Sequence, residues 1–206
     1  MQKILALVSF ASILSGCLST APKSATKWTI DGVKTAATIQ AFTRPQAATT
    51  AAAPIARLAS VTVRAPYDTR HLVVLRPDGS LAFDPYNEFA AQPASLIRSA
   101  AEKASRDSGL FSYVITHNSN ANAACTLEWT ISRLALDCRE NGSKSARVEL
   151  SILLTSSRAI LAESAAAASI PVSSDQMDFT AAFSQAFSEA ASRALDQLKN
   201  ATQNIK

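Results

Sequence analysis

The segment between residues 126 and 161 constrains the fold of this chain most strongly. Its first part, TLEWTISRLAL (126–136), alternates between apolar and polar residues, which is typical of a strand with one buried face. The Asn141-Gly142 pair that follows is a strong signal for a tight hairpin turn. The next stretch, ARVELSILLTSSRAIL (146–161), returns as the partner strand. The sequence therefore predicts a long β-hairpin in the second half of the chain.

The segment before this hairpin predicts three strands, a helix and a fourth strand. ARLASVTVRAP (56–66) indicates a half-buried strand that ends at its proline, and HLVVLRPDGSLAF (71–83) indicates two strands around a Pro-Asp-Gly turn. The helix has signals at both ends, since Pro93 suits the first helical position and Gly109 suits the position just after the last turn. LFSYVI (110–115) follows at once and indicates another strand.

A last helix is expected over residues 178–199. Its apolar residues recur at spacings of three and four and form one seam, made of Phe179, Phe183, Phe187, Ala190, Ala194 and Leu198. Such a seam favours a helix that covers a sheet over a helix that stands free. The predicted fold class is α/β (α+β), with the order β-β-β-α-β-β-β-α in a single domain.

The amino-terminal residues indicate an export signal. The apolar run Ile4–Ile13 follows Lys3 and is too short to cross the roughly 30 Å hydrocarbon core of a bilayer as a helix. Small residues then lead directly into Cys17 in the stretch ILSGCLS (13–19), a pattern that looks like a bacterial lipobox. This likeness implies cleavage between Gly16 and Cys17 and acyl chains on Cys17, which anchor a protein in a membrane. The alternative is a soluble exported protein.

The chain accordingly divides into three expected parts: a lipoprotein signal peptide at residues 1–16, the lipidated cysteine with a flexible tether at 17–54, and a folded domain at 55–200. The tether has room for a short hairpin around Asp31-Gly32. Leu18 stands where an aspartate would indicate retention in the inner membrane of enteric bacteria. We therefore expect an outer-membrane protein whose domain faces the periplasm.

Charge and motifs argue against nucleic-acid binding and catalysis. The net charge is +4, and no run of lysine and arginine reaches five residues. The sequence contains no G-x-S-x-G elbow, no P-loop and no dinucleotide-binding fingerprint. We expect no enzymatic activity, no cofactor and no metal site.

Cys125 and Cys138 leave a disulfide as an open question. An oxidising compartment would permit the two thiols to pair. If both lie on one continuous strand, their Cα atoms are about 40 Å apart, against the roughly 5.5 Å that a disulfide needs. A bridge therefore requires a bend or bulge between them.

Arg76, Tyr86, Phe89 and Pro93 are the candidate partner-binding residues. With Phe83, they gather an arginine and several aromatic rings around a strand-to-helix junction, as a docking surface does. The alternative is that these residues form the core and rim of the junction itself.

Residues 61–115 also carry a resemblance to a known family, the ABC-type transport auxiliary lipoproteins. The shared pattern is a strand that ends in proline, a strand with an arginine, a Tyr-x-x-Phe/Trp-Ala-x-x-Pro start to a helix, and a Gly-Leu-Phe after that helix. In this sequence the pattern falls at Pro66, Arg76, Tyr86, Phe89, Ala90, Pro93, Gly109 and Phe111. The chain departs from the family at Phe89, where tryptophan is common.

The resemblance implies a mixed β-sheet covered by two main helices. It also implies a non-catalytic outer-membrane lipoprotein that docks a periplasmic partner in an MCE/ABC-type system for lipid or another hydrophobic compound. The implied partners are an MCE-domain protein with its permease and ATPase, and a homo-oligomer is open. The alternatives are a lipoprotein that itself carries lipid and a structural lipoprotein of envelope assembly.

Overall fold

The computed structural model describes residues 26–28, 30, 53–139, 143–172 and 179–203. The expected signal peptide, Cys17, the hairpin at Asp31-Gly32 and the turn at Asn141-Gly142 lie outside these residues. The expectations about them therefore stay predictions.

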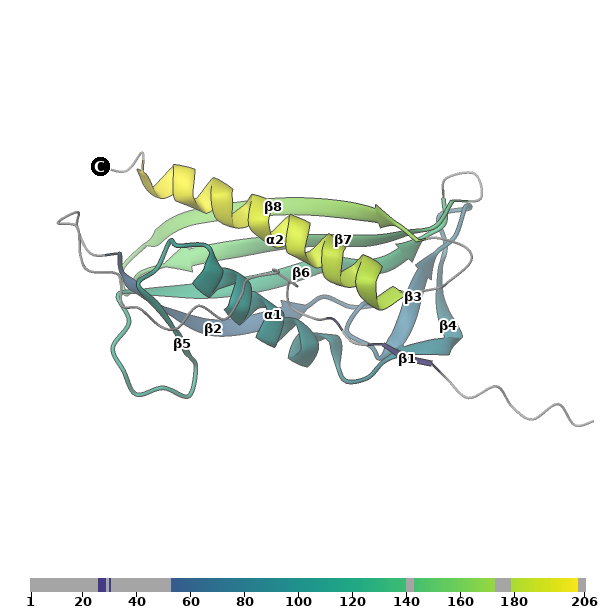
Figure 1. Ribbon diagram of the computed structural model, residues 1–206, viewed down its shortest axis with the longest axis horizontal. Helices are drawn as coiled ribbons and strands as arrows, with labels where there is room; N and C mark the ends of the chain where they lie inside the picture. Colours follow the sequence, from purple (N-terminus) through teal and green to yellow (C-terminus); the bar gives the residue numbers. More distant parts are fainter. Residues whose placement is uncertain (1–25, 29, 31–52, 140–142, 173–178, 204–206) are drawn as a thin grey trace, which may run out of the picture.

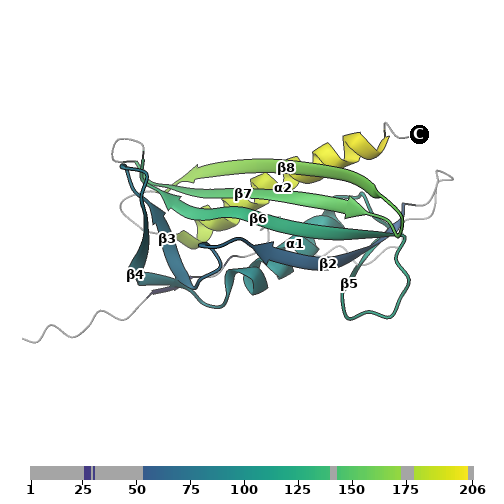
Figure 2. The same cartoon turned by 180° about the vertical axis from the view of Figure 1, so that it is seen from behind.

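One mixed sheet with two helices on the same face makes up the described fold (Figure 1). The elements are β1 (Thr26–Trp28), β2 (Ile55–Val63), β3 (His71–Leu75), β4 (Leu81–Phe89), α1 (Pro93–Asp107), β5 (Tyr113–Thr116), β6 (Cys125–Asp137), β7 (Ser145–Thr155), β8 (Ile160–Pro171) and α2 (Phe179–Gln203). Seen from behind, the sheet face opposite the helices carries no helix of the described residues (Figure 2). The predicted fold class is confirmed.

Strand β6 is the central strand of the sheet. Along one side it pairs in parallel with β2, through Cys125–Ile131, and then with β3 at Leu136 and Asp137. Along the other side it pairs antiparallel with β7, as the alternating sequences predict. The β3–β4 hairpin and β1 lie at one end of the molecule, and β5 lies at the other (Figures 1 and 2).

Strand β8 is absent from the predicted order, and that part of the prediction is wrong. The sequence ILAESAAAASIP was expected to hold the end of one strand and a loop, because alanine is depleted in strands and gives little alternation. In the structure β8 pairs antiparallel along the length of β7, from Ser145↔Pro171 to Thr155↔Ile160. Pairing with a strong neighbouring strand and cover from α2 outweigh the weak local preference.

Strand β1 is the second addition to the predicted order. It pairs in parallel with the end of β4, from Thr26↔Asn87 to Trp28↔Phe89, and Ile30 is buried in the core. Part of the segment expected to be a tether therefore adds a strand to the domain, ahead of the expected start near Ile55.

Helix α1 and the turn between β3 and β4 form where the sequence predicts them. Helix α1 begins at Pro93 and ends at Asp107, and Gly109 follows with a φ of +68°. Gly79 has a φ of +82° in the turn between β3 and β4, where its N–H donates to the carbonyl of Arg76 at 2.9 Å. Both glycines hold a left-handed conformation that other residues rarely adopt.

The core lies between the sheet and the two helices. Strand β7 alternates strictly, with Ala146, Val148, Leu150, Ile152 and Leu154 buried. Trp129 on β6 stacks on Phe187 of α2 with ring centroids 6.0 Å apart, and Phe89 meets Phe183 edge-on at 5.9 Å. The phenylalanine seam of α2 is therefore core. Among the described helices, none is long and apolar enough to cross a membrane.

Candidate functional site

Three large apolar side chains are exposed on the β3–β4 hairpin. Leu81, Phe83 and Tyr86 are 44%, 56% and 56% exposed, and Arg76 is exposed at the turn beside them. We call these four residues the hairpin surface. Single exposed apolar residues are ordinary, but three on one short strand are a candidate contact site.

Pairing within the hairpin explains why the side chains of Leu81 and Phe83 are exposed. Phe83 lies opposite Val73, and Leu81 lies opposite Leu75, so each pair shares one face of the hairpin. Val73 and Leu75 are next to the main sheet and are buried, whereas their partners lie one strand further out. The apolar face thus begins in the core and runs out to solvent.

Asp84 shapes the outer edge of β4. Its Oδ1 accepts hydrogen bonds from the backbone N–H of Tyr86 at 2.8 Å and of Asn87 at 3.2 Å, and its Oδ2 accepts from the Asn87 amide at 2.8 Å. Pro85 lies within this turn and has no N–H to donate. The kink and the proline interrupt the edge of β4 just before the residues that pair with β1.

The structure separates the four predicted partner-binding residues into two pairs. Arg76 and Tyr86 are exposed, as a docking role requires. Phe89 is 3% exposed against Phe183, and Pro93 is buried in the first turn of α1. Phe89 and Pro93 therefore belong to the core of the strand-to-helix junction, because α2 covers the end of β4. Phe83 and Leu81, in contrast, are exposed at the surface.

A second group of exposed apolar side chains lies at the other end of β6. Ile55, Tyr113, Ile160 and Leu161 are 39%, 58%, 69% and 36% exposed. Ile55 and Tyr113 are directly opposite each other on β2 and β5, and Ile160 begins β8 opposite Thr155. We call these four residues, with the loop 117–124, the distal surface. Sequence reasoning missed it, because its members come from three separate strands.

Arg57 holds the loop of the distal surface. Its guanidinium donates to the backbone carbonyls of Ser119 at 2.7 Å and Ala121 at 2.5 Å, with longer contacts to those of Thr116 and His117. A planar guanidinium with several donors suits such a task. No motif in the sequence identifies this role, since an isolated arginine on a strand has no pattern.

Replacing Arg57 with alanine is expected to release the loop 117–124 without unfolding the domain. The two short hydrogen bonds would be lost, and backbone amides in the loop should exchange with deuterium at least severalfold faster, while β6 and β7 keep their protection. Hydrogen exchange followed by mass spectrometry measures this. Arg64→Ala is the matched control, because Arg64 is an exposed arginine that directly follows β2. Equal exchange in both variants would contradict the role of Arg57.

The two cysteines of the domain are free. Cys125 begins β6 and is buried, and Cys138 directly follows its last residue. The possible disulfide between them is not formed, because β6 runs as one strand of 13 residues between the two positions. Burial raises the pKa of both thiols, which keeps them protonated and poorly nucleophilic.

A charged network lies at the end of β6 and along β7. Asp137 is 8% exposed and accepts hydrogen bonds from Arg139 at 2.6–3.3 Å, while Arg147 lies 3.6 Å from the same carboxylate. Arg147 also pairs with Glu149 at 2.8 Å, and Glu149 pairs with Arg133 at 2.9 Å. The hydrogen bond from Arg139 is the main cause of a lowered pKa at Asp137. The network links two neighbouring strands and therefore stabilises the sheet.

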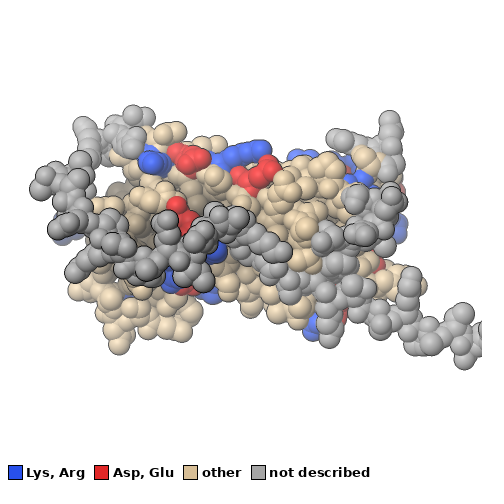
Figure 3. Space-filling model, in the orientation of Figure 1, with Lys and Arg blue, Asp and Glu red and all other residues tan. Residues whose placement is uncertain are grey.

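Charges on the helix-bearing face are mixed in sign. Figure 3 shows blue and red patches next to one another along the visible described surface. Opposite charges are also paired within each helix, as Glu102–Arg106 and Lys103–Asp107 on α1 and Glu189–Arg193 on α2, each pair four residues apart. Such a surface offers no single-sign field for nucleic acid.

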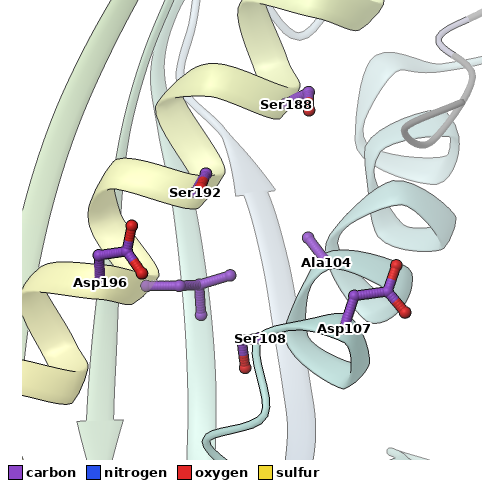
Figure 4. Close-up of a pocket in the computed structure, with 7 residues that line it drawn as sticks. Ala104, Asp107, Ser108, Ser188, Ser192 and Asp196 are labelled. Carbon is purple, nitrogen blue, oxygen red and sulfur yellow. The ribbon is translucent and has the colours of Figure 1, made fainter. Parts of the chain in front are cut away.

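A small cavity lies between the end of α1 and α2 (Figure 4). Its volume is about 180 Å³, and it is lined by Ala104, Asp107, Ser108, Ser188, Ser192, Leu195 and Asp196. Ligand pockets usually measure about 300–1,000 Å³ and are mostly apolar. This cavity is smaller, and two carboxylates and three hydroxyls interrupt its apolar lining, so it is a poor fit for an acyl chain. Among the described residues, no group of three His, Cys, Asp or Glu could hold a metal ion.

Comparison with solved structures agrees with this architecture. A protein from Xanthomonas campestris, of the family DUF330, is similar with a TM-score of 0.63 and 19% identity, over 74% of this chain and 88% of that one. An uncharacterized protein is similar with a TM-score of 0.54 and 12% identity, over 75% of this chain and 94% of that one. At these identities the likeness concerns the fold alone.

Comparison with sequence families identifies the relatives of the chain. No curated protein matches it. The family model described as "ABC-type transport auxiliary lipoprotein component" matches residues 38–194, which include β2 to β8 and the first half of α2. This match covers well over half of the 206 residues and agrees with the pattern at residues 61–115. The chain belongs to the family of ABC-type transport auxiliary lipoprotein components.

Proposed function

We propose that this protein is a non-catalytic accessory of an MCE/ABC-type transport system for lipid or another hydrophobic compound. The observation that carries the proposal is the family match over residues 38–194. The lipobox-like sequence at Cys17 adds an acyl anchor, with the outer membrane as its expected location and the domain in the periplasm. In this role the domain fixes the position of a partner and does no chemistry itself.

The described site features support a docking role over a carrier role. The cavity of about 180 Å³ between α1 and α2 is smaller than the usual ligand pocket, so this cavity is a poor site for a lipid. The apolar seam of α2 is buried by packing against the sheet, as the contact of Trp129 with Phe187 illustrates, and so is not free for an acyl chain. Exposed apolar side chains remain, and these are what a protein partner recognises.

The distal surface is the proposed contact for the MCE-domain partner. It lies at the β5 end of the molecule, and β6 separates it from the hairpin surface by 13 residues, or about 40 Å. Cys17 is nine residues from Thr26, which pairs beside the hairpin. The anchor is therefore attached near the hairpin, and the distal surface is the end that a protein in the periplasm can approach.

Site-specific photocrosslinking in intact envelopes tests this proposal. A benzophenone amino acid at Tyr113 should capture an MCE-domain protein or its permease, identified by mass spectrometry. The same amino acid at Thr62, an exposed position in the middle of the sheet, is the matched control and should capture neither. Capture from Tyr86 and not from Tyr113 would move the partner to the hairpin surface. Recovery of unrelated envelope proteins alone would overturn the transport role.

A further inference from the structure

We propose that the hairpin surface lies in the interface of the membrane that holds the acyl chains of Cys17. The inference rests on the proposed acyl anchor and goes beyond it, because it assigns a second membrane contact to the folded domain. The occupant of the hairpin surface is then a lipid surface, and the partner of the transport system binds elsewhere.

The first observation is the chemistry of the exposed side chains. Leu81, Phe83 and Tyr86 project from a single strand, each about half exposed. Tyrosine prefers the boundary between headgroups and acyl chains, since its ring is apolar and its hydroxyl is polar. Leucine and phenylalanine supply apolar area that can lie just below that boundary.

The second observation is where the chain from Cys17 joins the fold. Strand β1 is parallel to β4 and begins with Thr26 opposite Asn87, the residue that follows Tyr86. Cys17 is nine residues before Thr26, and nine residues span at most about 30 Å. The acyl anchor therefore holds the hairpin end close to the membrane, whereas the distal surface is a further 40 Å or so along β6.

The third observation is the size and form of the hairpin surface. Leu81, Phe83 and Tyr86 are three exposed residues of one strand, far fewer than the roughly 20–30 residues that each partner contributes to a standard protein interface. Strand addition to a narrow edge is interrupted at the Asp84 turn and Pro85, and β1 already pairs with the residues that follow. A lipid surface needs neither a large area nor a matching shape, so it suits this edge better than a protein does.

The charges near the hairpin indicate whether its contact with the membrane is electrostatic or apolar. Residues 64–88 contain Arg64, Arg70 and Arg76 against Asp68, Asp78, Asp84 and Glu88. Glu88 pairs with Arg70 at 3.0 Å, and Asp78 and Asp84 accept local hydrogen bonds. With no excess of positive charge, attraction to anionic lipid is weak, and the contact depends on the apolar side chains. It should therefore persist at high salt.

Fluorescence quenching by brominated acyl chains tests the proposal with the full lipidated protein. Two variants are placed in vesicles of phosphatidylethanolamine and phosphatidylglycerol: Phe83→Trp on the hairpin and Leu161→Trp on the distal surface as the matched control. Both keep Trp28 and Trp129, so the native background is the same. We expect quenching of the Phe83→Trp signal at least twice that of Leu161→Trp, unchanged in 0.5 M salt. Matching melting temperatures would verify that both variants fold.

Three results would overturn the proposal. Equal quenching in both variants would mean that the hairpin has no preferred contact with lipid. Quenching of Leu161→Trp above that of Phe83→Trp would mean that the distal surface faces the membrane. Crosslinking of the transport partner from Phe83, with no lipid quenching there, would replace the lipid by a protein.

Failure of the anchor is distinguished by mass spectrometry of the purified protein. An unmodified Cys17 would refute the acyl anchor of the proposed function, whatever the quenching shows. The same two variants, added to preformed vesicles without an anchor, then decide the hairpin contact alone. Preferential quenching of Phe83→Trp would support it, and none would overturn it.

Discussion

Replacing Trp129 with alanine is expected to lower the free energy of unfolding by about 3–5 kcal/mol, the usual cost of removing a large buried aromatic side chain. Trp129 is fully buried on β6 and stacks on Phe187 of α2, so its ring joins the central strand to the covering helix. Alanine would leave a cavity between the two layers. Chemical denaturation followed by far-ultraviolet circular dichroism measures the loss.

Trp129→Phe is the matched control for this prediction. The indole Nε1 has no hydrogen-bond partner among the described residues, so its removal breaks no described bond. Phenylalanine keeps a ring against Phe187 and leaves a smaller cavity than alanine does, so it should cost clearly less stability than Trp129→Ala. A loss below 1 kcal/mol for Trp129→Ala would mean that the layers pack differently from the described arrangement.

Replacing Asp137 with asparagine is expected to lower the free energy of unfolding by about 2 kcal/mol at pH 7, the order of a charge-assisted hydrogen bond. Asp137 is 8% exposed, and its carboxylate accepts from Arg139 and lies near Arg147. Asparagine keeps the shape but removes the charge, so two guanidinium groups lose their shared partner. Thermal and chemical unfolding at neutral pH measure the change.

The pH dependence of this difference follows from the lowered pKa of Asp137. The hydrogen bond from Arg139 holds that pKa below the ordinary value of 3.8. The carboxylate therefore stabilises the fold fully above pH 3.8, and this contribution is lost as the pH falls through the lower folded-state pKa. Wild type and Asp137→Asn should converge in stability at acid pH.

Asp78→Asn is the control for Asp137→Asn. Its hydrogen bonds with Ser80 lower the pKa of Asp78 too, but in an exposed turn. Solvent screening should make its effect on stability smaller than that of Asp137. Equal losses of unfolding free energy in both variants would contradict the larger stabilisation expected from the network around Asp137.

The elements that the sequence predicts well are those with strong local chemistry. The alternation in β6 and β7, Pro93 at the start of α1 and Gly109 after its end each require one particular structure. The order predicted from them lacks β1 and β8. Strand β1 has only three residues, and the alanines of β8 acquire a strand conformation from pairing with β7. Non-local pairing of this kind has no signature in a single sequence.

The candidate site is harder to predict than the fold, because exposure depends on what covers a residue. Phe89 and Tyr86 are aromatic residues three positions apart on one strand, yet α2 covers the first and leaves the second open. The distal surface depends on β2, β5 and β8 ending together, and Arg57 acts on a loop about sixty positions away. These juxtapositions arise only when the sheet is assembled.

The way β3 joins the sheet has a consequence for local unfolding. Only Val74↔Leu136 and Leu75↔Asp137 link β3 to β6 in the described ladder, whereas β7 runs along nearly the whole of β6. We call the β3–β4 hairpin the arm. Because its pairing with β6 is so short, the arm opens at a lower free energy than the β6–β7 ladder and forms a cooperative unit of its own. Tilt of the arm against the main sheet would then leave β6, β7 and β8 undisturbed. Strands β6, β7 and β8 then keep one orientation toward a protein partner while the arm follows the motion of the membrane surface that it contacts.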